Sequence, residues 1–378
     1  MLIRPRVLLV AIVANAMFGG LAETSVAAES ATIWILSGQS NACGRAALPG
    51  PDPDPRVTMY VPRQASYITA QDPLPHMGTT GTGPWVAAAA TVVASQGDPI
   101  RMCGFASGGK PISFWDVGQP GHDGLFPVVR QAGQGASVFL WYQGESDTRR
   151  LQPATYEGAL RSHVDRVREA AGNDQLLVVI VQLGPSLREG VGGYMAVREA
   201  QRRFVANDAH AILVPALGRT LMDTVHLDNA GYRELGAEIG RALLATRHRN
   251  QDVGWPGPVL DAAVVLPPQE RGEQRLVAAH FAEVQRLKNV NPLDFSVIDT
   301  EGTNPCVGVT AQGQTLLTLR LQRDVRLPAK LVYGFGARPT AELTDEHGNR
   351  APAVQRQITT GVAPADEATK AANGAGER

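Results

Sequence analysis

Cysteine is scarce in this chain. Three residues (Cys43, Cys103 and Cys306) occur among 378, which is too few for the disulfide framework of a small secreted scaffold. Cys43 and Cys103 can pair only if the two predicted strand ends that carry them are adjacent, and buried free thiols are the alternative. Stability must therefore come from hydrophobic cores, and the chain is long enough for two of them.

Motifs of several enzyme classes are also missing. The chain has no His-Glu-x-x-His, no Cys-x-x-Cys and no His/Asp cluster at metal-ligand spacing, so neither a metal nor another cofactor is expected. It has no glycine-rich loop of the kind that cradles a phosphate. The absence of Gly-x-Ser-x-Gly argues against the α/β-hydrolase fold.

The chain carries little net charge. Its 35 Lys and Arg residues balance 36 Asp and Glu residues, for a formal net charge of -1, and no dense basic tract occurs. Nucleic acid and anionic membranes are therefore not expected as partners. A hydrophobic content of 44% with 19% charged residues is typical of a globular protein. Nothing in the sequence indicates the oligomeric state.

A hydrophobic run of notable length occurs at the N-terminus. Arg4 and Arg6 precede an apolar stretch, Val7–Phe18, and Val26–Ala28 offers the small residues that a signal peptidase accepts. The run is shorter than the roughly 20 residues of a membrane-spanning helix. We therefore expect a signal peptide over residues 1–28, a secreted or periplasmic protein, and no stable membrane insertion.

Strands and helices alternate from Thr32 to about Thr246. Strands separated by helices of this length form βαβ units, so we predict a mostly parallel sheet. The strands are predicted at Thr32–Gly38, Pro99–Phe105, Ala136–Tyr142, Leu176–Gln182 and Ala211–Val214, the helices at Pro84–Ser95, Pro153–Ala171, Tyr194–Asn207 and Gly231–Thr246, and two long loops at Leu48–Val57 and Ala106–His122.

The composition changes after residue 250. A Pro/Gly-rich linker over 251–258 precedes short β-type runs with turn signals between them, which is typical of a small antiparallel β-sandwich. We predict a first domain over 29–250, a second over 259–360 and a disordered tail over 361–378. The strands of the second domain are predicted at Arg275–Phe281, Asp294–Ile298, Thr315–Leu321 and Lys330–Phe335.

Four polar segments follow predicted strands of the first domain. The carboxyl ends of such strands are where ligands and catalytic groups lie in open α/β sheets. Together the segments contain a serine, a histidine with an aspartate three residues before it, a glycine pair and an additional carboxylate, which is an inventory for acyl transfer. They are Gly38–Asn41, Ser107–Ile112, Trp141–Asp147 and Asp223–His226.

Ser40 is the candidate nucleophile and His226 the candidate base. Asp223 can accept the Nδ1 proton of His226 and so leave Nε2 as the base. Glu145 follows a buried strand, where a carboxylate is costly unless it is paired; it can orient His226 instead, bind the Ser40 loop or contact substrate. Taken alone, Asp-x-x-His is a weak signal that a capping aspartate beside a loop histidine would also give.

An oxyanion needs hydrogen-bond donors near the nucleophile. The backbone N–H groups of Ser40 and of Gly108 or Gly109 are candidates, since glycine lets the backbone approach closely. The Gln143 amide can add a side-chain donor. An ordinary turn for the glycine pair and a satisfied polar group for Gln143 are the structural alternatives.

Three more residues are candidates for substrate binding. Gln39 and Asn41 flank Ser40 and can contact substrate or hold the serine loop together. Trp115 lies in a predicted loop and can stack on a sugar ring. Trp85 and Trp141 lie in a predicted helix and a predicted strand, where core packing is expected instead.

These segments resemble the SGNH-hydrolase superfamily, and more closely its sialate O-acetylesterase / acetylxylan esterase branch (carbohydrate esterase family 6-like). The likeness covers about residues 32–245. The matching motifs are Gly-Gln-Ser-Asn (Gly38–Asn41), a Gly-Gly segment running into a tryptophan (Gly108–Trp115), Trp-x-Gln-Gly-Glu-Ser-Asp (Trp141–Asp147), Asp-x-x-His (Asp223–His226), Gln182-Leu183 and Arg198–Gln201.

The resemblance implies a three-layer α/β/α, flavodoxin-like fold and a metal-free serine esterase that removes O-acetyl groups from a carbohydrate through an acyl-enzyme. It implies that His226 is the base, that Gly109 and Gln143 help to form the oxyanion hole, and that either Asp223 or Glu145 orients the base. The alternatives are an acetylxylan esterase, a lipid or thioester hydrolase of the same superfamily, and a carbohydrate-binding protein that has lost catalysis.

Overall fold

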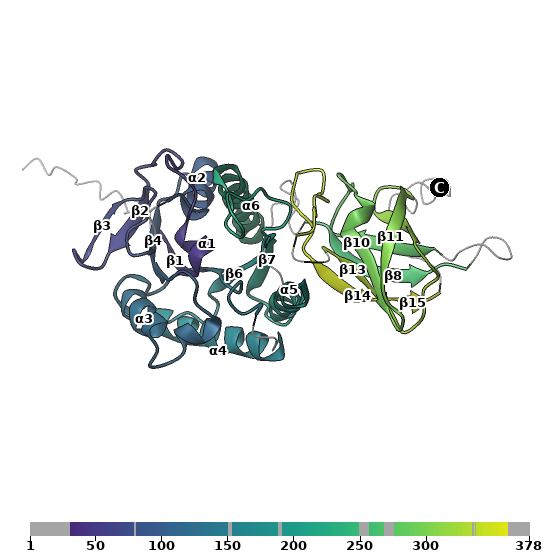
Figure 1. Ribbon diagram of the computed structural model, residues 1–378. Helices are drawn as coiled ribbons and strands as arrows, with labels where there is room; N and C mark the ends of the chain where they lie inside the picture. The colour runs from purple at the N-terminus through teal and green to yellow at the C-terminus, as the bar shows by residue number, and fades with distance from the viewer. Residues whose placement is uncertain are drawn as a thin grey trace, which may run out of the picture.

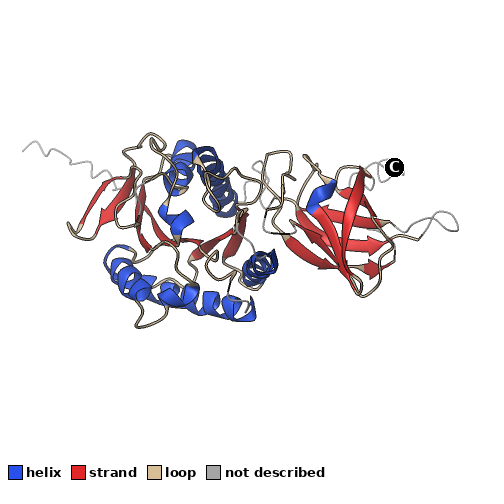
Figure 2. Ribbon diagram, viewed as in Figure 1, coloured by secondary structure: helices blue, strands red, loops and turns tan. Residues whose placement is uncertain are grey.

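The chain forms an α/β unit and an all-β unit, seen next to each other in Figures 1 and 2. The computed structural model describes residues 31–78, 81–149, 153–187, 191–248, 257–267, 276–334, 336 and 338–361. The predicted signal peptide, most of the predicted linker and nearly all of the predicted tail lie outside these residues. Within them, no helix combines the length and the apolar character needed to cross a membrane.

The α/β unit is built on a seven-stranded sheet in the order β3-β2-β4-β1-β5-β6-β7. β1 lies in the middle and pairs in parallel with β4 and β5, whereas β3 runs antiparallel to β2. The predicted mostly parallel sheet is therefore confirmed. Its strands are β1 (Thr32–Gly38), β2 (Val57–Val61), β3 (Ser66–Thr69), β4 (Ile100–Ala106), β5 (Val138–Tyr142), β6 (Leu177–Gln182) and β7 (Ala211–Pro215).

Helices cover both faces of this sheet, as Figure 2 shows. α2 packs against α6, and α4 packs against α3 and α5, which gives the predicted three layers. The helices are α1 (Ser40–Cys43), α2 (Trp85–Gln96), α3 (Pro120–Ala132), α4 (Pro153–Ala171), α5 (Val191–Ala206) and α6 (Asn229–His248), with a 3₁₀ turn η1 (Ile112–Trp115). η1 and the start of α3 correct the predicted loop Ala106–His122.

The all-β unit is one curled, eight-stranded sheet in the order β14-β13-β10-β11-β12-β9-β8-β15. β14 and β15 follow each other along the chain but lie at opposite ends of this order, so the sheet folds back on itself around a core. The predicted antiparallel sandwich is confirmed, although β15 pairs with β8 in parallel. The strands are β8 (Val259–Val265), β9 (Val277–Ala282), β10 (Phe295–Asp299), β11 (Gly302–Ala311), β12 (Leu316–Leu321), β13 (Lys330–Tyr333), β14 (Val354–Gln357) and β15 (Thr359–Thr360).

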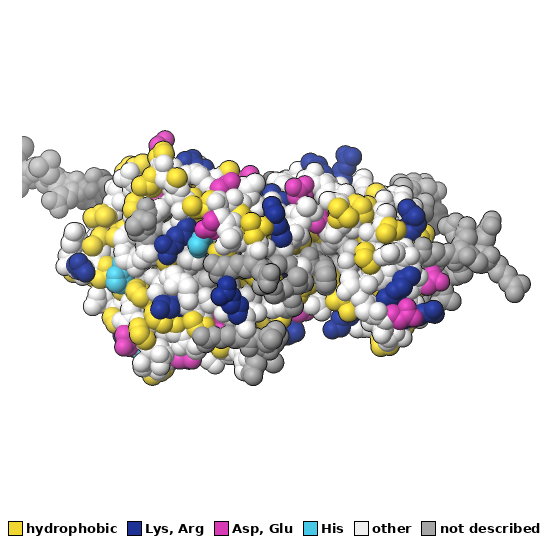
Figure 3. Space-filling model, viewed as in Figure 1, with side chains coloured by type: hydrophobic (Ala, Val, Ile, Leu, Met, Phe, Trp, Pro, Cys, Tyr) yellow, Lys and Arg dark blue, Asp and Glu magenta, His cyan; other side chains and the backbone are white. Residues whose placement is uncertain are grey.

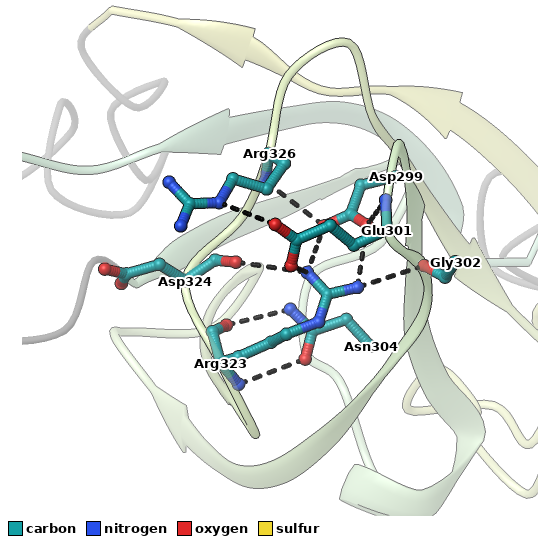
Figure 4. A network of polar contacts seen from close by, with 7 residues as sticks. All are labelled: Asp299, Glu301, Gly302, Asn304, Arg323, Asp324 and Arg326. Atoms are coloured by element: carbon teal, nitrogen blue, oxygen red, sulfur yellow. Dashed lines mark hydrogen bonds and ion pairs between the residues drawn. The ribbon is translucent and has the colours of Figure 1, made fainter.

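An ion-pair network joins two turns of the all-β unit (Figure 4). Nη1 and Nη2 of Arg323 donate to the Asp299 carboxylate at 2.6 and 2.7 Å. The backbone N–H groups of Glu301 and Arg326 donate to the same carboxylate at 2.9 and 3.1 Å. These contacts, with the Arg323 side chain foremost, lower the pKa of Asp299 to about 2.

The three cysteines are buried free thiols. Burial raises the pKa of Cys43 to about 11 and that of Cys103 to about 12. Since both are free thiols, Cys43 and Cys103 are not joined in the possible disulfide, and both side chains pack in the core of the α/β unit.

Candidate active site

The carboxyl ends of three adjacent strands bring the predicted polar segments together. Gly38 at the end of β1 pairs with Ala106 at the end of β4 and with Tyr142 at the end of β5. The segments that follow these strands must therefore start side by side at one edge of the sheet. The Asp223–His226 segment reaches the same place from the loop between β7 and α6.

The nucleophile candidate sits in a turn that requires glycine. Gly38 has a φ of +139°, and a Cβ there would lie 2.1 Å from the carbonyl oxygen of Tyr142. The chain can therefore turn sharply after β1, and Ser40 begins α1 with its side chain largely buried. A Cβ at Gly108 would lie 3.5 Å from the Ser40 Cβ, so the first glycine of the pair lies next to the serine.

Asp223 and His226 form a close pair. The carboxylate oxygen Oδ2 of Asp223 lies 2.6 Å from Nδ1 of His226, and Oδ1 accepts the backbone N–H groups of Val225 and His226, both at 2.8 Å. Burial favours the neutral carboxyl, but the hydrogen bonds from the His226 ring and from the two backbone groups outweigh it and lower the pKa of Asp223 to about 2. Asp223 is therefore an anion fixed against the ring.

Glu145 meets the serine loop through Asn41. Its Oε1 accepts a hydrogen bond from Nδ2 of Asn41 at 2.6 Å. The same Nδ2 donates to the carbonyl of Val225 at 3.1 Å, and Oδ1 of Asn41 accepts from the Tyr232 hydroxyl at 2.6 Å and the Leu227 N–H at 3.4 Å. Asn41 thus joins the serine turn to the residues on either side of His226.

The Gln143 side chain is committed within the protein. Its Nε2 donates to Oδ2 of Asp147 at 2.6 Å and to the carbonyl of Lys110 at 3.0 Å, and its Oε1 accepts from the Tyr156 hydroxyl at 3.1 Å. A primary amide has two N–H donors, and both have partners here. The structure therefore gives Gln143 a bracing role and lends no support to the predicted oxyanion contact.

Gln39 and Asn41 also brace the site. Oε1 of Gln39 accepts the backbone N–H groups of Ser146 and Gly144 at 3.2 and 3.4 Å. Both side chains are buried. Of the two roles considered for them, holding the loops together is the one the contacts support.

Trp115 corrects a prediction. The residue is 0% exposed, and its ring lies 5.1 Å edge-to-face from those of Phe114 and Trp141. η1 turns the indole into the core, so no face is left on which a sugar could stack. The loop assignment failed here because the short 3₁₀ turn has no sequence pattern of its own.

Arg45 is a site residue that the sequence analysis misses. A Cβ at Gly108 would lie 2.5 Å from Nη2 of Arg45, so the guanidinium packs on the glycine that also touches Ser40. Its Nε is buried and has no hydrogen-bond partner among the described residues. The signal in the sequence is slight: a Gly-Arg pair directly after the serine helix.

Metal ligands do not gather at this site or elsewhere in the described part of the chain, where no group of three or more His, Cys, Asp or Glu residues is placed to hold an ion. The surface seen in Figure 3 mixes basic and acidic side chains over both units.

Comparisons with known proteins extend this description. Residues 30–245 match the family described as carbohydrate esterase, sialic acid-specific acetylesterase. The chain is 28% identical over 242 residues to the probable carbohydrate esterase At4g34215 of Arabidopsis thaliana, a match that spans 56% of this chain and 90% of that protein.

Solved structures share the fold. The structure of the Arabidopsis protein has a TM-score of 0.51 at 24% identity and covers 57% of this chain and 98% of its own. XAC1771, a carbohydrate acetylesterase from Xanthomonas citri, has a TM-score of 0.68 at 16% identity and covers 86% of this chain and 80% of its own. The family match spans more than half of the chain, which therefore belongs to the carbohydrate esterase, sialic acid-specific acetylesterase family and is a carboxylic ester hydrolase.

Proposed function

We propose that this protein removes O-acetyl groups from carbohydrates through an acyl-enzyme on Ser40. The observation that carries the proposal is the Asp223–His226 pair, which Asn41 ties to the serine turn through Val225 and Leu227. A serine, a base and a fixed carboxylate in this arrangement are what nucleophilic acyl transfer requires.

The reaction follows the logic of the serine triad. The Ser40 Oγ attacks the acetyl carbonyl carbon while Nε2 of His226 takes the hydroxyl proton. When the tetrahedral intermediate collapses, the bond to the sugar oxygen breaks and His226 returns the proton to that oxygen. Water, deprotonated by His226, then attacks the acyl carbon; the bond to the Ser40 Oγ breaks, His226 returns the proton to Oγ, and acetate leaves. The backbone N–H groups of Ser40 and of Gly108 or Gly109 are the proposed donors to the oxyanion.

We assign the orientation of His226 to Asp223. The 2.6 Å contact to Nδ1 supports this choice over Glu145, whose Oε1 bonds Asn41. Glu145 is then a positioning residue for the serine loop. An N-terminal segment with the features of a signal peptide supports action outside the cytoplasm, and the disappearance of residues 1–28 from the mature exported protein would test this.

For the substrate we infer an acetylated sugar that bears a carboxylate, as sialic acids do, rather than a neutral xylan. Arg45 supports this, since its guanidinium lies beside the glycine that touches Ser40 and its Nε has no hydrogen-bond partner among the described residues. Arg45→Gln should raise KM for O-acetylated sialic acid about tenfold and leave KM for a neutral aryl acetate unchanged. Equal effects on both substrates would contradict the inference.

Ser40→Ala tests the nucleophile. Its kcat on an aryl acetate should fall by about 10⁴- to 10⁶-fold with the circular dichroism spectrum unchanged. Ser37→Ala is the matched control, because this buried β1 hydroxyl donates to the Phe105 carbonyl instead. Mass spectrometry of the wild-type protein, quenched rapidly with acid during turnover, should detect an acetyl group on Ser40. Near wild-type turnover of Ser40→Ala would refute the mechanism.

The pH profile tests the base. His226 must be neutral to accept the serine proton, so kcat/KM should fall as the pH is lowered. Asp223 keeps its charge down to about pH 2, because its pKa is lowered to about 2, so protonation of this carboxylate does not cause the fall. A flat profile between pH 5 and 8 would count against His226.

A further inference from the structure

We propose that part of the all-β unit positions the catalytic base, because it anchors the loop that carries Asp223 and His226. We call residues 216–228, between β7 and α6, the histidine loop. The inference rests on the proposed function, since it concerns how the proposed base is positioned. It gives a role to the second unit, which shares no strand with the seven-stranded sheet.

Leu217 of the histidine loop is built into the core of the other unit. Its side chain is fully buried and packs within the hydrophobic cluster whose other buried members all come from residues 260–358. A Cβ at Gly334 would lie 3.5 Å from its Cδ1. The histidine loop therefore contributes an apolar anchor to the all-β unit six residues before Asp223.

The next two residues are also held against the all-β unit. A Cβ at Gly218 would lie 2.5 Å from the carbonyl oxygen of Ala341, so the backbone of the all-β unit lies directly against the loop. Arg219 forms a buried ion pair with Glu238 of α6. The other oxygen of Glu238 accepts the backbone N–H of Arg350 at 2.9 Å, which ties the pair to the all-β unit.

Arg198 of α5 makes a second bridge. Its fully buried guanidinium donates to the carbonyl of Gly336 in the all-β unit at 2.6 Å, and to the carbonyls of Gly184 and Leu183 after β6 at 2.6 and 3.0 Å. Burial lowers the pKa of Arg198 to about 10, so the group remains a cation at neutral pH. It clamps the segment after β6 to the all-β unit.

That segment supports the histidine loop in turn. The Leu187 N–H and the Ser186 hydroxyl donate to the Thr224 carbonyl at 2.7 and 3.3 Å. Thr224 follows Asp223 directly in the sequence and lies two residues before His226. Residues 217–219 therefore support the chain before the Asp223–His226 pair, and the contact to Thr224 supports the chain between the two residues. Both supporting segments are fastened to the all-β unit.

Loosening these anchors should misplace the base. A displacement of about 1 Å from a substitution far from the chemistry can lower the rate about 10²-fold. Substrate contacts near Ser40 are not involved, so KM should change little. The contacts that join Asn41 to Val225 and Leu227 would remain and keep part of the activity.

The test compares four core and interface variants in the full-length protein. Leu217→Ala should lower kcat about 10²-fold, and the milder Leu217→Val should lower it less. Leu319→Ala removes an equally buried leucine from the same core, on β12, and should match the loss of thermal stability while keeping kcat. Arg241→Ala, on α6, removes a hydrogen bond to Asn349 of the all-β unit that involves no residue of the histidine loop, and should also keep kcat.

A spectroscopic signature separates positioning from general destabilisation. The Nδ1 proton of His226, hydrogen-bonded to Asp223, should give a downfield proton resonance that is absent in His226→Gln. Leu217→Val and Leu217→Ala should broaden or remove it, and Leu319→Ala should retain it. If the two Leu217 variants fold and keep both kcat and the resonance, the anchoring is refuted. If Ser40→Ala retains activity, the proposed function fails instead, whatever the Leu217 variants do.

Discussion

Two Asp–His pairs with the same contact distance lie in the two units of the molecule. Nδ1 is 2.6 Å from a carboxylate oxygen both for His226 with Asp223 and for His280 with Asp261. His226 lies on a loop that Asn41 fastens to the serine turn. His280 lies on β9, opposite Ala262 and Leu316 of its neighbour strands, and its Nε2 is buried without a hydrogen-bond partner among the described residues.

The difference shows what makes such a pair a candidate for catalysis. The contact to the carboxylate fixes the ring in both units, but only the surroundings of the other nitrogen decide what the ring can do. On β9 that nitrogen faces packed protein. On the histidine loop, the residues on either side of His226 bond Asn41, the neighbour of Ser40, so we expect Nε2 of this ring to face the nucleophile candidate.

The first prediction concerns the carboxylate of each Asp–His pair. Asp223→Asn should lower kcat by up to about 10⁴-fold, because the amide favours the wrong imidazole tautomer. Asp261→Asn makes the same change at the same distance from its histidine and should leave kcat unchanged. Steady-state kinetics on one aryl acetate measures both. A comparable loss in the two variants would mean that the effect of Asp223 is structural.

The sequence located this site because its residues follow strand ends. Gly38–Asn41 and Trp141–Asp147 stand directly after β-type runs, and parallel strands deliver such segments to one edge. The direction in which each side chain points could not be predicted in this way. Gln143 turns its amide to Asp147, and Trp115 turns into the core, because of tertiary partners that no local pattern encodes.

In the fold, too, elements with a clear local pattern were predicted and elements that depend on tertiary contacts were not. The central strands and α4 have strong periodicity, and α4 is observed at its predicted bounds. α3 was not predicted because Gly121, Gly124 and Pro127 weaken its helical pattern. β11 was not predicted because Gly302 and Pro305 are residues typical of turns. Pairing with β10 and β12 overrides that preference.

The second prediction concerns the additional carboxylate of the active site. Glu145→Gln keeps an oxygen that can accept from Asn41 but removes the charge. A hydrogen bond to a charged group is stronger than a neutral one by about 1 kcal/mol, so kcat should fall only about five- to tenfold. Measuring kcat of Glu145→Gln and of Asp223→Asn under the same conditions shows which of the two carboxylates orients His226. A larger loss for Glu145→Gln than for Asp223→Asn would make Glu145 the orienting acid.

The third prediction compares Asp223 with Asp299, two carboxyls whose pKa is lowered to about 2 in different units. Asp299 contacts Arg323 far from Ser40, so Asp299→Asn should leave kcat unchanged and lower Tm at pH 7 by about 2–4 °C. Because its pKa in the folded protein is depressed, the carboxylate stabilises the fold above the unfolded value of about 3.9, and this contribution disappears as the pH falls to about 2. The Tm values of variant and wild type, measured by calorimetry, should therefore converge toward pH 2.

The neighbouring Glu301 provides the control. Its side chain is 51% exposed, and Glu301→Gln should change Tm less, because solvent screens an exposed ion pair. If the difference in Tm between Asp299→Asn and wild type stayed the same at pH 2, Asp299 would stabilise the turn through the packing of its side chain and not through its charge.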